Sequence, residues 1–328
     1  MTFEKTALVN VTCPICEENM TSSSSGEVLL AHNLTKHVIK CPTCQSFFLH
    51  PLPTSAELRQ VYQPDYFRGF FKSYWKDYYK GTQLGKRLTK IKPRGNFLDI
   101  GCAIGSMLAG IRDTTVWQVY GLEADEKAAK YARTKRGLKV FGDNLEQLQF
   151  EAGFFDYIYA NNVIEHIPQP ANFFKATNRL LAKGGIFHIS TPNGPIDLYP
   201  SLMLGSPENP VLTRHAGHVN FFSKPGLFLL AQKTGFQVVA FKIFHFKTAL
   251  KCKLIWPGSR RKLAQSLAGG EKTIRSDSQK VKLEDYEKLI PPRPPDWYSG
   301  LRSWSRQLFK AFAVPVGADF KIILKKVE

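Results

Sequence analysis

The stretch Phe97-Leu98-Asp99-Ile100-Gly101-Cys102-Ala103-Ile104-Gly105 decides how this chain is organised. The apolar residues around its start predict a short buried strand over 95–100. Gly101 and Gly105 predict a tight turn, because glycine adopts backbone angles that side chains forbid and lets a ligand approach the main chain. A helix is expected from Ser106 onward. Strand, glycine turn and helix form the first unit of a doubly wound α/β domain, which binds its ligand at that turn.

Acidic residues beside the turn indicate the kind of ligand. A dinucleotide fingerprint needs G-x-G-x-x-G, but Ser106 stands where the third glycine would fall. Asp99 would repel a pyrophosphate and suits a positively charged ligand. A second predicted strand, 116–123, ends in Glu123, where a carboxylate can accept both ribose hydroxyls. Together these features favour S-adenosylmethionine, which carries an ammonium and a sulfonium.

On these residues the chain resembles the class I S-adenosylmethionine-dependent methyltransferases. The resemblance continues through 155–167, similar to the family's fourth strand and following turn, and 180–189, similar to its fifth strand region. It covers roughly residues 93–245 and a last strand near 320–325. It implies an α/β, Rossmann-like, doubly wound seven-stranded sheet.

The resemblance also implies which residues hold the methyl donor. Phe141-Gly142-Asp143-Asn144 resembles the stretch whose acid meets the adenine, and Asn161 stands where the fourth strand should end. Ala103 occupies a position where the family more often has glycine. The predicted donor site comprises Asp99, Gly101, Ala103, Gly105, Glu123, Ala124, Asp143, Asn144 and Asn161.

Four cysteines near the start of the chain predict a second kind of site. Cys13, Cys16, Cys41 and Cys44 form two C-x-x-C pairs, a spacing typical of structural zinc held by four thiolates. Disulfides would need a secretory context, and a redox dithiol would need only one pair. After the second pair, the stretches 47–54 and 57–62 resemble the ribbon-to-linker segment of bacterial methyltransferases that have an amino-terminal zinc ribbon.

Composition and motif spacing predict how the chain is divided. With 328 residues, 43% of them hydrophobic, it can bury a large core. We expect a zinc-ribbon module at 1–55, a helical linker and cap at 56–92, and a methyltransferase domain at 93–328 with insertions at about 194–215 and 246–316. Since there is no signal region or apolar run long enough to span a membrane, we expect a cytoplasmic protein.

The net charge of +18 lies mainly in the flanks. Residues 1–94 hold 13 basic and 7 acidic side chains (+6), residues 95–244 hold 14 and 12 (+2), and residues 245–328 hold 18 and 8 (+10). Basic flanks favour an anionic partner, such as nucleic acid, a phosphate-bearing substrate or a membrane surface. A general basic excess that favours solubility would give the same distribution.

Three histidines are candidate catalytic residues. In the family, a histidine-rich loop after the fifth strand faces the acceptor, and the stretch 213–223 resembles it. We predict that His218 is the general base or orients the acceptor, with His215 and His166 as alternatives, because imidazole titrates near neutral pH. A loop histidine that only makes hydrogen bonds is the competing interpretation.

A possible metal site overlaps these histidines. Asn162-x-x-Glu165-His166 is similar to the Glu-x-x-Glu-His of ubiquinone-pathway O-methyltransferases, in which acids and a histidine can hold a divalent metal. Because Asn162 replaces the first acid, we favour the simpler interpretation that Glu165 and His166 orient the turn.

The remaining segments leave alternatives open. Aromatic residues spaced as Phe67, Phe71, Tyr74 and Tyr78 predict helix packing, although aromatic and lysine side chains together can also stack nucleobases. The insertion after 194 is either a substrate lid or a loop with a small core. An amphipathic helix over 301–312 either contacts an anionic membrane or packs on the protein.

We therefore expect methyl transfer from S-adenosylmethionine to an O or C atom of a small or carrier-linked acceptor, for example a sugar or secondary metabolite. One alternative is an RNA methyltransferase whose ribbon and basic flanks bind phosphates. Another is a non-catalytic binding protein on the same fold. Nucleic acid is the less favoured partner, and the basic carboxyl-terminal stretch is the expected contact with any membrane periphery.

Overall fold

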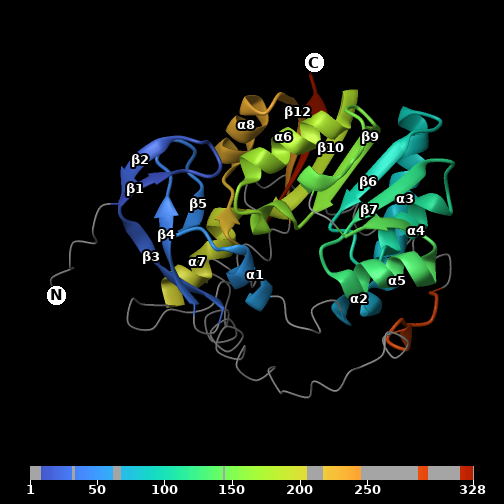
Figure 1. Cartoon of the computed structure of the whole chain (residues 1–328), viewed down its shortest axis with the longest axis horizontal. Coiled ribbons are helices and arrows are strands. Elements are labelled where there is room, and N and C mark those ends of the chain that lie inside the picture. Colours follow the sequence, from blue (N-terminus) through green and yellow to red (C-terminus); the bar gives the residue numbers. More distant parts are fainter. Residues whose placement is uncertain are drawn as a thin grey trace.

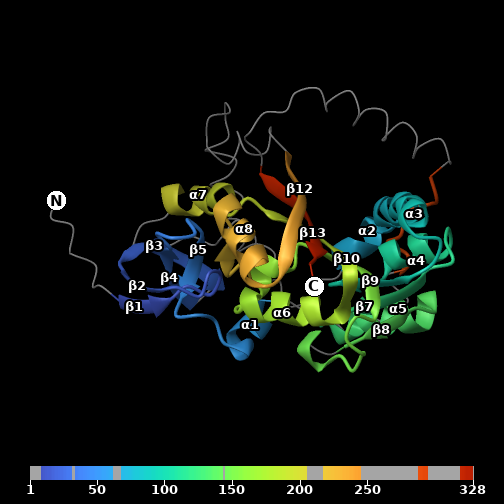
Figure 2. The same cartoon turned by 90° about the horizontal axis from the view of Figure 1, so that it is seen from above.

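A computed structural model describes residues 9–31, 34–61, 68–142, 145–204, 217–244, 287–294 and 318–327. A small β-rich module lies at one end, and a large sheet flanked by helices makes up the rest (Figures 1 and 2). Asp143, Asn144, His215 and the predicted helix over 301–312 lie outside the described residues. Within the described part, no helix is long and apolar enough to cross a bilayer.

The large sheet has seven strands. They are β6 (Asn96–Ile100), β7 (Gln118–Leu122), β8 (Lys139–Phe141), β9 (Phe155–Asn161), β10 (Leu181–Pro192), β12 (Phe236–Phe244) and β13 (Asp319–Lys326). Their order is β12-β13-β10-β9-β6-β7-β8, and only β13 runs antiparallel to its neighbours. The predicted fold class is confirmed.

Helices cover both faces of this sheet. One face carries α3 (Tyr74–Ile91), α4 (Ser106–Arg112) and α5 (Glu126–Arg136), and the other carries α6 (Pro170–Leu180) and α8 (Lys224–Lys233). Side chains along β6 point alternately to the two faces of the sheet, and each face has its own hydrophobic core. Phe97 packs with Leu88 of α3, whereas Leu98 packs in the core that contains α6 and α8.

Helices α3 and α4 cross in close contact. A Cβ at Gly110 would lie 2.1 Å from the Tyr78 carbonyl oxygen, and one at Gly81 would lie 2.1 Å from that of Met107. Only hydrogen fits at these positions, so the two glycines set the helix spacing.

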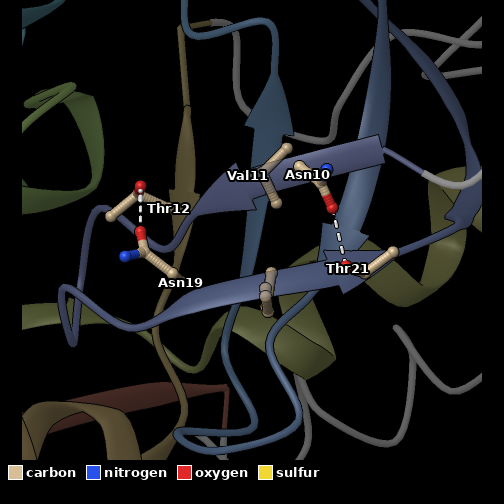
Figure 3. A pocket seen from close by; sticks show the side chains of 6 residues that line it. Asn10, Val11, Thr12, Asn19 and Thr21 are labelled. Atoms are coloured by element: carbon tan, nitrogen blue, oxygen red, sulfur yellow. Dashed lines mark hydrogen bonds between the residues drawn. The ribbon is translucent and has the colours of Figure 1, made fainter.

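The amino-terminal module is made of short strands. They are β1 (Val9–Thr12), β2 (Asn19–Ser22), β3 (Ser24–Ala31), β4 (Leu34–Lys40) and β5 (Phe47–His50). Thr12 and Thr21 donate hydrogen bonds across the β1–β2 ribbon to Asn19 and Asn10, at 2.7 and 2.6 Å (Figure 3). These bonds hold together the two strands that flank the first cysteine pair.

A strand from far along the chain completes the module's sheet. β11 (Asn220–Phe221) pairs antiparallel with β5, giving the order β11-β5-β4-β3. The insertion helix α7 (Gly194–Leu204) packs Leu198 against Val28 and Leu30 of the same module. This part of the insertion therefore contributes to a small second core.

Two of the linker helices cover the glycine turn, namely α2 (Arg68–Lys72) and the start of α3. The first linker helix, α1 (Ser55–Val61), packs instead on the amino-terminal module, where Leu58 joins the core of Val28 and Leu30. Phe71 and Tyr74 are buried against Ile104 of the turn and Tyr131 of α5. The short segment 287–294 lies on the same aromatic surface, where the Trp75 indole donates to the Pro291 carbonyl at 2.7 Å.

Candidate active site

The glycine turn is fixed to the end of β7 by hydrogen bonds. The amides of Gly101 and Cys102 donate to the Leu122 carbonyl at 2.8 and 3.1 Å. Glu123 accepts from the Ala103 amide at 2.7 Å and from the Asp125 amide at 2.9 Å. Its carboxylate therefore shapes the turn and still has lone pairs for a ligand.

The turn requires left-handed backbone at three positions. Gly101, Ala103 and Gly105 have φ values of 72°, 50° and 74°. Alanine tolerates this conformation less well than glycine, at a cost of roughly 1 kcal/mol. Ala103 adopts this left-handed conformation, and in it the Ala103 amide donates its hydrogen bond to Glu123.

Asp99 is a buried acid without a hydrogen-bonding partner among the described residues. It is only 4% exposed, and burial, followed by the nearby charges of Glu123 and Asp77, raises the pKa of its carboxyl group well above the usual value. An isolated buried carboxylate is costly unless a cation compensates it. Asp99 thus favours a positively charged ligand at the turn.

The predicted donor residues that are described meet at one edge of the sheet. Asp99, Gly101, Ala103, Gly105 and Glu123 lie at the carboxyl ends of β6 and β7. Ala124 follows them as an exposed residue, and Asn161 ends β9, the strand next to β6. Their contacts with the donor stay a prediction.

A second group of polar side chains lies beyond the end of β9. The His218 Nδ1 donates to Asp197 Oδ2 of α7 at 2.6 Å, and both residues are buried. This bond places the other ring nitrogen, Nε2, 4.0 Å from Glu165 Oε1. An imidazole whose Nδ1–H is held by a carboxylate in this way can act as a general base through Nε2.

Glu165 is the other buried acid of this group. It follows β9 in the 3₁₀ turn η2 (Ile164–His166) and accepts a hydrogen bond from Thr191 of β10 at 2.9 Å. Its Oε1 atom has no hydrogen-bonding partner within the described part of the chain. Burial raises the pKa of Glu165 to about 7, although the His218 charge opposes that shift.

His166 completes a possible set of metal ligands. Its Nδ1 donates to the Gly217 carbonyl at 2.9 Å, which leaves Nε2 with a lone pair. The ligand atoms of Glu165, His166 and His218 lie within 4.8 Å of one another. Two imidazoles and a carboxylate fit a divalent transition metal, so these residues could hold one without help from Asn162.

Sequence reasoning missed Asp197 and Thr191. Asp197 lies 21 residues before His218, and Thr191 lies 26 residues after Glu165. One signal was present, because Asp197 interrupts an apolar run between Ile196 and Leu198. The partner of such an acid depends on how the insertion folds.

The four predicted cysteine ligands lie together and are fully buried. The sulfur atoms of Cys13 and Cys44 are 3.8 Å apart, and those of Cys16 and Cys41 are 3.6 Å apart. A tetrahedron of sulfurs about 2.3 Å from zinc has edges of about 3.8 Å. The donor set and its dimensions therefore fit zinc.

Comparison with known proteins identifies the family. A family model described as a methyltransferase domain matches residues 74–240, which span the glycine turn, Glu165 and His218. Together with the fold, this match shows that the chain belongs to the class I methyltransferases.

The individual relatives act on different acceptors. A ubiquinone biosynthesis O-methyltransferase of Caulobacter sp. (strain K31) is 35% identical over 29% of this chain and 40% of its own length. A sterol 24-C-methyltransferase of Schizosaccharomyces pombe is 30% identical over 30% of this chain and 28% of its own length. The chain thus spans less than half the length of these relatives.

A solved S-adenosylmethionine-dependent methyltransferase of Mesorhizobium loti has 14% identity and a TM-score of 0.41. The likeness covers 70% of this chain and 90% of that one.

Proposed function

We propose that this protein transfers a methyl group from S-adenosylmethionine to an oxygen or carbon atom of a small or carrier-linked acceptor. The observation that carries this proposal is the buried acid Asp99, whose carboxyl group makes no hydrogen bond to any described residue and lies beside a glycine turn anchored by Glu123. Relatives that methylate oxygen or carbon support the reaction class. They do not favour an RNA substrate or a non-catalytic role.

The donor, when bound, supplies an electrophilic methyl group, so the chain has to align the acceptor and exclude water. For a hydroxyl acceptor, His218 Nε2 takes the proton as the oxygen bonds to the methyl carbon. Bound S-adenosylmethionine would supply the methyl group as its methyl–sulfur bond breaks, with the electron pair kept on sulfur and S-adenosylhomocysteine as the leaving group. Asp197 holds His218 in the required tautomer and stabilises its charged form.

Calorimetry with S-adenosylhomocysteine tests donor binding. Asp99→Asn keeps the shape of the side chain but removes its charge, so it should weaken binding at least about tenfold. Asp113→Asn, at the exposed end of α4, is the matched control and should leave binding unchanged. Wild-type protein that binds neither S-adenosylmethionine nor its product would refute the proposal.

We also propose that Cys13, Cys16, Cys41 and Cys44 hold structural zinc. Metal analysis of purified protein should give one zinc per chain. Cobalt substitution should give the absorption bands of tetrahedral thiolate ligation. A metal-free protein with the same melting temperature would contradict the assignment.

A further inference from the structure

Basic side chains gather on the sheet face that carries Asp99, several strands away from it. Asp99 pairs in register with Tyr159, Tyr159 with His188, and His188 with Ile323. Two residues earlier on β13, Lys321 pairs with Ser190 on one side and Lys242 on the other. Residues paired in register lie on the same face of a sheet, so this face becomes basic toward β12.

Among the described residues, no acidic side chain pairs with the cations on this face. Arg87 of α3, Lys242 of β12 and Lys321 of β13 form no ion pair or hydrogen bond with any described residue. Burial, together with the nearby charges of Arg87 and Lys242, lowers the pKa of Lys321 to about 8. Three cations that repel one another remain together at a cost, which a bound anion would remove.

His188 gives an independent indication that this face of the sheet binds an anion. It is 5% exposed, and its Nδ1 lies 2.7 Å from the Tyr157 hydroxyl. Because burial, Lys321 and Arg87 lower the pKa of His188 and burial raises that of Tyr157, the ring is neutral and the phenol protonated. With the phenol as donor to Nδ1, the ring proton sits on Nε2, a buried atom without a partner among the described residues.

We propose that Arg87, Lys242, Lys321 and His188 bind a phosphate group of the acceptor. This inference rests on the proposed function and narrows its substrate class to phosphorylated acceptors. Lys321 is level with Asn161 across two strand spacings, about 10 Å along the sheet. The phosphate would therefore lie several bonds from the methylated atom. A dianion suits three cations better than a monoanionic carboxylate.

Titration of the full-length, metal-loaded protein with inorganic phosphate at constant ionic strength tests the site without donor or acceptor. We expect millimolar binding, weakened about tenfold by Lys321→Met and also weakened by Lys242→Met. Lys325→Met is the matched control, because Lys325 lies on the same face of β13 but is exposed and further from Ser190. It should change the affinity less than twofold.

Two outcomes would overturn the phosphate site. One is undetectable phosphate binding by wild type, and the other is equal weakening by Lys325→Met, which would indicate general surface charge. Binding of S-adenosylhomocysteine by the same samples separates the two proposals. If that ligand binds and phosphate does not, the anion site fails while methyl transfer stands; if that ligand does not bind, the proposed function fails.

Discussion

Asp99 and His218 are both buried, but their surroundings prepare them differently. Asp99 has no hydrogen-bonding partner among the described residues, whereas His218 is fixed by Asp197 at 2.6 Å. The first arrangement stores unfavourable energy that a cationic ligand can release. The second fixes the His218 imidazole in one orientation, so the proposed proton transfer would depend on Asp197, which need not touch the substrate.

Asp197→Asn should lower kcat by about 10²–10⁴-fold, because an amide at this position favours the wrong imidazole tautomer. The affinity for S-adenosylhomocysteine should stay within twofold of wild type. Steady-state methyl transfer and calorimetry measure the two quantities. Tyr199→Phe, an exposed change on the same helix, is the control. An equal loss of donor affinity would indicate a merely structural role for Asp197.

Asp99→Asn should stabilise the free protein while weakening donor binding. The pKa of Asp99 is raised in the folded state, so its ionisation destabilises the fold as pH rises above the unfolded pKa. The amide removes that penalty, and the melting temperature should increase more at pH 8 than at pH 4. A melting temperature that falls equally at both pH values would show that the amide does not fit.

Lys321 should make the stability of the protein depend on pH with a sign opposite to that of Asp99. Its folded pKa of about 8 lies below its unfolded value of 10.5, because of burial, Arg87 and Lys242. Between these values the unfolded chain binds more protons, so this residue makes stability rise with pH from about 8 to 10.5. Comparing wild type with Lys321→Met by urea unfolding isolates the effect. If the stability difference between the two proteins is independent of pH, the assignment is wrong.

At the scale of elements, the sequence predicted those helices, strands and turns that a local residue pattern determines. The strand over 95–100, the glycine turn and the helix from Ser106 onward appear as β6, its following turn and α4 (Ser106–Arg112). Each depends on periodicity or on glycine within a few residues. The pairing of β11 with β5 could not be predicted, because a two-residue strand has no pattern and its partner lies more than 170 residues away.

The same distinction applies to the candidate site. The cysteines were predicted from residue type and spacing, whereas His218 and His166 were predicted from a resemblance to the family, and the catalytic role of these histidines stays a prediction. Asp197 and Thr191 were missed because their importance depends on three-dimensional contacts alone.

Gly110→Ala should destabilise the protein by about 1–3 kcal/mol, since the added methyl group meets the Tyr78 carbonyl and neither helix backbone can move freely. Gly69→Ala in α2 is the control, because no atom lies within 4 Å of its added methyl group. Urea unfolding measures both. Similar stabilities for the two variants would show that the helix crossing adjusts.

At the scale of the whole molecule, the amino-terminal module and the candidate active site share a segment. The Leu49 amide of β5 donates to the Val219 carbonyl at 3.0 Å, and the Val219 amide donates to the Glu165 carbonyl at 2.8 Å. Ser223 adds a bond to the Cys44 carbonyl at 2.6 Å. The loop that carries His218 is therefore held on one side by the module and on the other by η2.

Cys41→Ser should loosen that loop. With the proposed zinc lost, the module unfolds locally, and amide exchange at 217–222 should accelerate at least tenfold. Exchange in β6 and α4, which lie away from the module, should change little (Figure 1). Unchanged exchange at 217–222 would show that the loop keeps its structure without the module.

The shared strand β11 couples the proposed zinc site to the proposed proton acceptor. We expect a peroxide or a strong chelator that acts on the cysteines to lower methyl transfer without reaching His218, by releasing the loop from its support. A transplant of this methyltransferase core onto another protein should include the first fifty residues, because without them the His218 loop would lose one of its two supports.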